Sequence, residues 1–193
     1  MLACMSDVAQ LLEAENLLVL ATHPGEEVLS CGALIARACA RGRPPLVAIM
    51  TDGGEDTALA EALARQARAA AAALGLPEGR LFLLGLHRGT APTPGSALFR
   101  ALVGGLHFLM WSRDCGVVLA PEAGLGDAAS AAAAARVLAA QTGVGLVRHG
   151  TGAPWLAPAP ARAAKRAALA AYGMPAAEGA ERYLTPSGQP HRR

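Results

Sequence analysis

The chain has 193 residues, 53% of them hydrophobic, and a formal net charge of +2. This length predicts a single domain with its own core. The nearly balanced charge, without a Lys/Arg stripe, argues against nucleic acid as a partner. The four cysteines contain no C-x-x-C pair, so neither a zinc knuckle nor a redox motif is indicated and reduced thiols are expected.

Strands and helices are expected to alternate along the whole chain. The apolar run at 17–21 is continuous, which is typical of a strand buried on both faces. From residue 28 the apolar residues recur at helical spacing. Further strands are expected at 46–50, 80–84, 116–120 and 144–147, and helices at 5–13, 28–41, 58–74, 96–112, 127–141 and 161–172. This order predicts an α/β domain with a mainly parallel sheet.

No segment of the sequence is expected to enter a membrane. The longest apolar run, 101–111, is shorter than the roughly 18 residues that span a bilayer and predicts a buried helix instead. His107 and Trp111 are then expected to pack in the core, as is Trp155. Since the N-terminus also lacks the pattern of a signal peptide, we expect a cytoplasmic protein.

The turn after the first predicted strand carries the candidate chemistry. His23, Glu26 and Glu27 lie there, and ligands of open α/β sheets bind beyond the carboxyl ends of strands. Histidine and carboxylate are usual zinc ligands, although catalytic zinc needs a third ligand and an open position. A structural alternative is that the glutamates stabilise a helix N-terminus while His23 bonds the turn. The negative charge and Pro24 argue against a dinucleotide site, which needs glycines around a pyrophosphate.

The segment LVLATHPGEEVLSCGALIARACARG resembles the opening of the PIG-L/LmbE-type de-N-acetylases, whose loop typically reads A-H-P-D-D-E. VAIMTDGGED is similar to their second strand with its T-D-G turn, and RAAAAALGLPEGRLFLLGL to the helix and strand that follow. The resemblance covers nearly the whole chain. It implies a Rossmann-like three-layer domain over residues 1–193, with 174–193 expected as a loosely docked tail. It also implies zinc and hydrolysis of the N-acetyl group of N-acetylglucosamine-type derivatives, so the implied partner is a small amino-sugar-like molecule.

The resemblance assigns roles to the residues of the first loop. His23 and Glu26 fall on metal-ligand positions. Gly25 stands where the family has the aspartate that acts as general base. Because glycine cannot take a proton, Glu26 or Glu27 is expected to replace that base.

Other positions of the site depart from the family pattern as well. Ser130 falls on or near the second metal histidine, and Arg88 replaces an acid. A third metal ligand would therefore have to come from His149 or His87. Arg88, Asp127 and Ser130 are the implied substrate-binding residues.

These substitutions leave two functions open. Loss of a general base alone costs about 10²–10⁴ in rate, and two protein ligands seldom hold catalytic zinc. The first hypothesis is a zinc-dependent amide hydrolase. The second is a catalytically inactive relative that acts as a binding or scaffold module.

Overall fold

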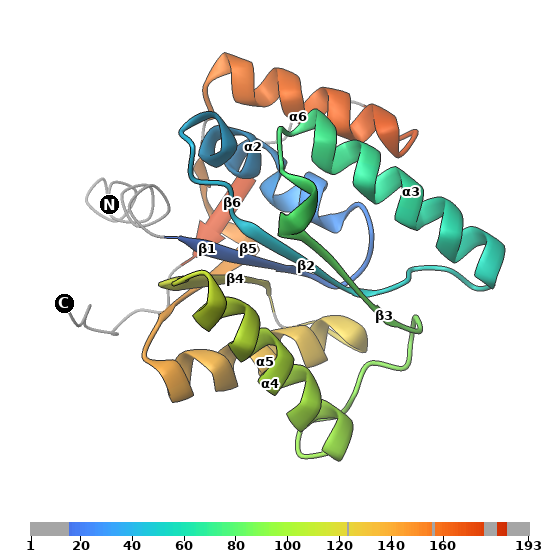
Figure 1. Ribbon diagram of the computed structural model, residues 1–193, viewed down its shortest axis with the longest axis vertical. Coiled ribbons are helices and arrows are strands. Elements are labelled where there is room, and N and C mark those ends of the chain that lie inside the picture. The colour runs from blue at the N-terminus through green and yellow to red at the C-terminus, as the bar shows by residue number, and fades with distance from the viewer. Residues whose placement is uncertain (1–15, 123, 156, 176–180, 185–193) are drawn as a thin grey trace.

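The computed structural model describes residues 16–122, 124–155, 157–175 and 181–184 (Figure 1). Its elements in chain order are β1 (Leu17–Ala21), α2 (Glu26–Ala40), β2 (Leu46–Thr51), α3 (Thr57–Ala73), the short 3₁₀ helix η1 (Glu78–Arg80), β3 (Leu81–Leu86), α4 (Ala97–Ser112), β4 (Val117–Pro121), α5 (Asp127–Thr142), β5 (Gly145–Trp155), α6 (Ala159–Ala171) and β6 (Glu181–Leu184). The helix expected at 5–13 lies outside the described residues.

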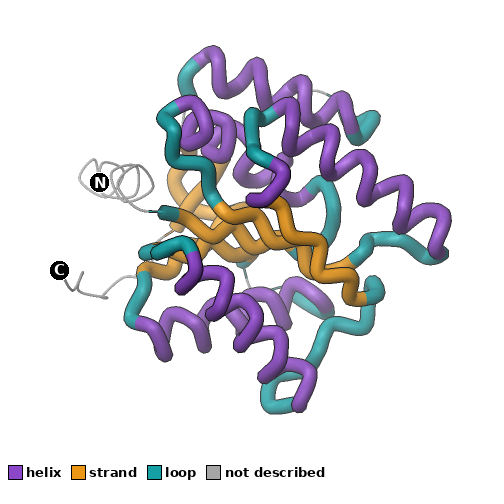
Figure 2. Tube along the Cα trace, in the orientation of Figure 1, coloured by secondary structure: helices purple, strands orange, loops and turns teal. Residues whose placement is uncertain are grey.

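The six strands form one sheet in the order β3-β2-β1-β4-β5-β6. All neighbours pair in parallel except β5 and β6, which are antiparallel. In Figure 2 the strands form a central layer with helices on both sides. The prediction of a three-layer α/β domain with a mainly parallel sheet is confirmed. The strand order reverses between β1 and β4, and such a switch point opens a crevice at the carboxyl edge of the sheet.

Strand β1 explains how the core is divided. Leu17, Val19 and Ala21 belong to the core under α2, α3 and α6. Leu18 and Leu20 belong to the core under α4 and α5. All five side chains are buried, as the continuous apolar run predicted for a strand covered on both faces.

Strand β5 is much longer than the expected strand at 144–147. It continues to Trp155 because β6, from the segment expected to be a C-terminal tail, pairs with residues 148–155. Tyr183 of β6 is 2% exposed and packs edge-on against Trp155, with ring centroids 6.2 Å apart. The expectation that Trp155 is a packing residue is thus confirmed.

The expectation of a wholly buried helix at 101–111 is wrong for its outer face. Phe108 is 63% and Trp111 74% exposed, and His107 is exposed as well. Helix α4 lies in an outer layer, so it buries a single stripe that consists of Phe99, Val103, Leu106 and Met110. The sequence did not indicate this exposed face, because apolar residues occur all round the helix. None of the described helices is long and apolar enough to cross a membrane.

Candidate functional site

The loop between β1 and α2 lies at the carboxyl edge of the sheet and is fixed to its neighbours (Figure 1). The backbone N–H and the hydroxyl of Thr51, at the end of β2, donate to the Thr22 carbonyl at 2.8 and 2.9 Å. Pro24 packs so closely on Gly53 that a Cβ there would lie 2.8 Å from Pro24 Cδ. The loop is therefore held rigidly where the fold would place a ligand.

Both glutamates of the loop are bound to other protein groups. The Thr22 N–H donates to Glu26 Oε2. The Tyr172 hydroxyl donates to Glu27 Oε1 at 2.6 Å, and the Gly25 N–H donates to Glu27 Oε2 at 2.8 Å. These hydrogen bonds join the loop to itself and to the end of α6.

The environment of Glu27 changes its protonation. Its side chain is buried, and this desolvation raises the pKa of the carboxyl to about 7. The hydrogen bond from Tyr172 opposes the shift without cancelling it. Burial beside Glu27 in turn raises the pKa of the Tyr172 hydroxyl above its usual value. A carboxyl that titrates near neutral pH is typical of acid–base sites, although structural groups also show it.

Gly25, where the resemblance implies a general base, lies against the side chain of Met174. Its φ of 96° lies in the left-handed region that favours glycine. A Cβ at this position would lie 2.7 Å from Met174 Cε. The end of the Met174 side chain, just beyond α6, would therefore have to shift to admit a side chain at position 25.

Replacing Gly25 by Asp is expected to lower the free energy of unfolding by about 1–3 kcal/mol, because the residue is strained at this φ and meets Met174. Urea denaturation measures this loss. Gly42→Asp is the matched control, since Gly42 also has positive φ but nothing lies within 4 Å of a Cβ there. Equal losses in the two variants would show that Met174 does not close the site.

The histidines considered as metal ligands each have a separate environment. His23 is exposed, with Nδ1 3.4 Å from the Pro24 carbonyl oxygen. His149 is buried, and its Nε2 lies 3.0 Å from the Leu20 carbonyl oxygen. Burial lowers the pKa of His149, which favours the neutral ring donating from Nε2. His87 Nδ1 lies 3.1 Å from Asp52 Oδ2 in the loops after β2 and β3.

These positions do not make a zinc site. Within the described part of the chain, no three His, Cys, Asp or Glu side chains are grouped so that they could hold a metal ion. A tetrahedral zinc site needs three such ligands with free lone pairs. Glu27 accepts hydrogen bonds at both of its oxygens, and Glu26 accepts one at Oε2. The described residues therefore do not fit zinc.

The three residues implied in substrate binding lie around the loop between β3 and α4. Asp127 accepts the N–H groups of Gly89 and Ala91 at 2.8 and 3.1 Å. The buried Ser130 hydroxyl donates to the Pro92 carbonyl at 2.6 Å. The Arg88 N–H donates to Asp52 Oδ1 at 3.1 Å, while its side chain is exposed. Asp127 and Ser130 thus attach the loop to the start of α5.

Ser130→Ala should loosen this loop, which Asp127 still holds at Gly89 and Ala91. Loss of a buried hydrogen bond costs about 1–2 kcal/mol, and faster amide hydrogen exchange is expected at Gly89 and Ala91. Ser112→Ala is the control, because the Ser112 hydroxyl bonds only within its own helix, to Leu109. Unchanged exchange in Ser130→Ala would contradict the anchoring role.

A buried ion pair near α2 escaped the sequence analysis. Lys165 of α6 and Glu181 of β6 are 5% and 4% exposed, and Lys165 Nζ lies 2.8 Å from Glu181 Oε1. The Tyr183 hydroxyl lies 2.7 Å from Glu181 Oε2. The pair thus joins α6 to the last described strand.

The same side chains bond to backbone groups inside α2. Lys165 Nζ donates to the Leu29 carbonyl at 2.6 Å, and Glu181 accepts the N–H groups of Ala33 and Leu34 at 2.7 and 3.1 Å. Such bonds insert side chains into the i→i−4 ladder of a helix. A sequence signal did exist, because Lys165 is the only lysine among the 193 residues.

Comparison with solved structures identifies the fold. The N,N'-diacetylchitobiose deacetylase from Pyrococcus horikoshii is 16% identical over 86% of this chain and 74% of its own, with a TM-score of 0.66. The conserved protein TT1542 from Thermus thermophilus is 22% identical over 89% and 94%, with a TM-score of 0.63. GalB, the 4-carboxy-2-hydroxymuconate hydratase from Pseudomonas putida, is 17% identical over 81% and 78%, with a TM-score of 0.63.

The chain therefore has the fold of the LmbE-like deacetylases. No family model matches the sequence, and no curated protein matches it. GalB is a hydratase with a similar fold, so the fold alone does not determine the reaction, which depends on the residues of the site.

Proposed function

We propose that the protein is a non-catalytic member of the deacetylase fold that binds a small amino-sugar-like molecule beside the loop of His23. The observation that carries this proposal is the glycine at position 25, whose φ of 96° strains any side chain and where a Cβ would meet Met174 Cε at 2.7 Å. Glu26 and Glu27, which would have to replace the missing base, accept hydrogen bonds from the loop and from Tyr172. Both oxygens of Glu27 and one oxygen of Glu26 are thus occupied by hydrogen bonds that hold the loop.

Two features of the loop support binding of a polar ligand. The His23 imidazole is exposed at the sheet edge, where a ligand can reach it. The Thr22 hydroxyl is buried and has no hydrogen-bond partner among the described residues; a movement of the loop that exposed it would let a ligand supply the missing partner. Sugar hydroxyl and acetamido groups supply such partners.

The second candidate is an amide hydrolase, and Glu27 is the observation in its favour. Its carboxyl pKa of about 7 would allow it to give and take a proton near neutral pH. Its burial and its hydrogen bond to Tyr172 argue against direct contact with a substrate.

One pair of assays separates the two functions. N-acetylglucosamine and N,N'-diacetylchitobiose are titrated by calorimetry, and acetate release is followed in parallel. We expect saturable binding that His23→Ala weakens, without acetate release. Acetate release that disappears in Glu27→Gln would establish the hydrolase, and absence of binding by both sugars would refute an amino-sugar module.

A further inference from the structure

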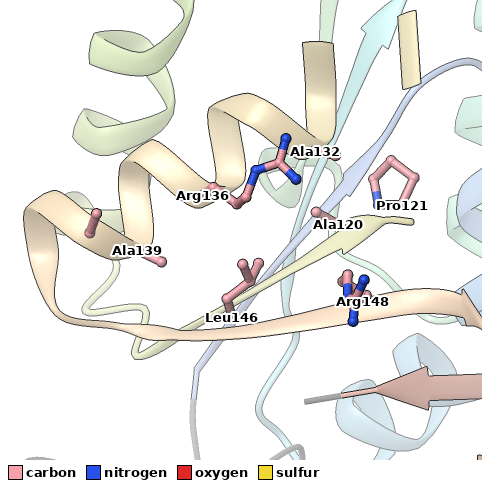
Figure 3. Close-up of a pocket in the computed structure, with 8 residues that line it drawn as sticks. Ala120, Pro121, Ala132, Arg136, Ala139, Leu146 and Arg148 are labelled. Carbon is pink, nitrogen blue, oxygen red and sulfur yellow. The ribbon is translucent and has the colours of Figure 1, made fainter. Parts of the chain in front are cut away.

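A cavity of about 270 Å³ lies between α5 and the strands β4 and β5 (Figure 3). Leu146 on its wall packs against the core under α4 and α5, whereas Val147, which follows it, belongs to the core under α2. Because successive residues of a strand point to opposite faces, the cavity opens on the face of the sheet away from α2. It is therefore separate from the proposed sugar site.

The alanines of α5 create this space. Ala132, Ala139 and Ala140 line the cavity from the helix, and each presents only a methyl group to it. Leu146 and the end of β4 complete an apolar wall. Small-molecule sites are commonly lined in this way, with a few polar groups that fix the orientation of the ligand.

Two arginines supply the polar groups. Figure 3 shows Arg136 extending from α5 and Arg148 rising from β5, with Ala120 between them. Arg148 lies 3.9 Å from Glu122, in a pair whose side chains are 35% and 42% exposed, and such pairs contribute little. Arg136 forms no ion pair with a residue of the described ranges. The cavity is thus lined by two cationic side chains, and the carboxylate near them, Glu122, forms only a weak ion pair with Arg148.

We propose that this cavity binds a small organic anion, in which a carboxylate or phosphate group lies between Arg136 and Arg148 and a flat apolar body rests on Leu146 and the alanines. Guanidinium groups bond bidentately to both kinds of anion. Burying the hydrocarbon surface of the ligand against the apolar walls makes the free energy of binding more favourable. An uncharged molecule of the same shape would leave Arg136 without an ionic partner and Arg148 with only its weak pair to Glu122.

Calorimetric titration with 1-naphthoate, 1-naphthyl phosphate and the uncharged 1-naphthalenemethanol tests the proposal. We expect the better anion to bind at least about tenfold more tightly than the alcohol, since charge-assisted hydrogen bonds are stronger than neutral ones. The anion that binds more tightly shows whether the cavity prefers a carboxylate or a phosphate group. Failure of both anions to bind more tightly than the alcohol would overturn the proposal.

Variants locate the binding. Arg136→Met and Arg148→Met should each weaken anion binding about tenfold and leave the alcohol unaffected, whereas Arg162→Met on the exposed side of α6 should change nothing. Ala140→Leu should weaken the binding of all three ligands, because the larger side chain fills the rim of the cavity. Ala69→Leu, at an exposed position of α3, is the control and should not change binding. Anion binding that persists unchanged in both arginine variants would show that it occurs elsewhere.

Discussion

Replacing Lys165 by Met is expected to lower the free energy of unfolding by about 3–5 kcal/mol, the largest effect of any variant considered. The substitution removes the cation but leaves the Glu181 carboxylate buried, and an uncompensated buried charge has a cost of this size. It also removes the Nζ donor from the Leu29 carbonyl inside α2. Urea denaturation followed by circular dichroism measures the loss.

The control and the double variant make this test specific. Arg166→Met removes an exposed cation from the next position of α6 and should change stability by less than about 0.5 kcal/mol. Adding Glu181→Gln to Lys165→Met should recover part of the loss, because the buried charge is then gone. Strictly additive losses would mean that the two side chains do not interact.

The second large effect is a pH dependence that originates in Glu27. The carboxyl pKa is 4.5 without the fold and about 7 within it, so the native state retains a proton that the unfolded chain releases. The contribution of Glu27 is therefore complete below pH 4.5 and is lost as the pH rises to about 7. A pKa shift of this size corresponds to a change of about 3 kcal/mol in the free energy of unfolding.

Glu27→Gln isolates this contribution, because the amide keeps the shape of the neutral acid. Stability curves from pH 5 to 8 should fall more steeply for the wild type than for the variant. His149 has the opposite effect on stability. Burial lowers its pKa, so the stabilisation it contributes is lost as the pH falls below the usual pKa of histidine. This loss is the same in the wild type and in the variant. Glu61→Gln on exposed α3 controls for the charge change, and parallel curves for wild type and Glu27→Gln would contradict the assignment.

The sequence was a good guide to the fold because the signals for β1 and its loop are local. The run of five buried residues from Leu17 to Ala21 and the helical spacing after Val28 depend only on near neighbours. Strand β6 depends instead on pairing with β5, and the short segment around Glu181 carries no such pattern. The outer face of α4 was mistaken for core because its composition is apolar all round.

The site was harder to predict because its geometry depends on distant partners. The resemblance implies a general base at the position of Gly25, but the sequence could not show that Met174 lies beside it. It also could not show that Glu27 is bound by Tyr172, 145 positions away. The resemblance implies a metal-ligand position at or near Ser130 and substrate binding by Asp127, whereas in the structure both side chains form hydrogen bonds with the backbone of the β3–α4 loop.

The central claim is that the polar groups of the β1–α2 loop hold the fold together and do not hold a metal. Elemental analysis of the purified protein after exposure to zinc and dialysis tests it most directly, with His23→Ala treated in parallel. The account predicts far less than one zinc per chain and no difference between the two proteins. One zinc per wild-type chain that is lost in His23→Ala would contradict it.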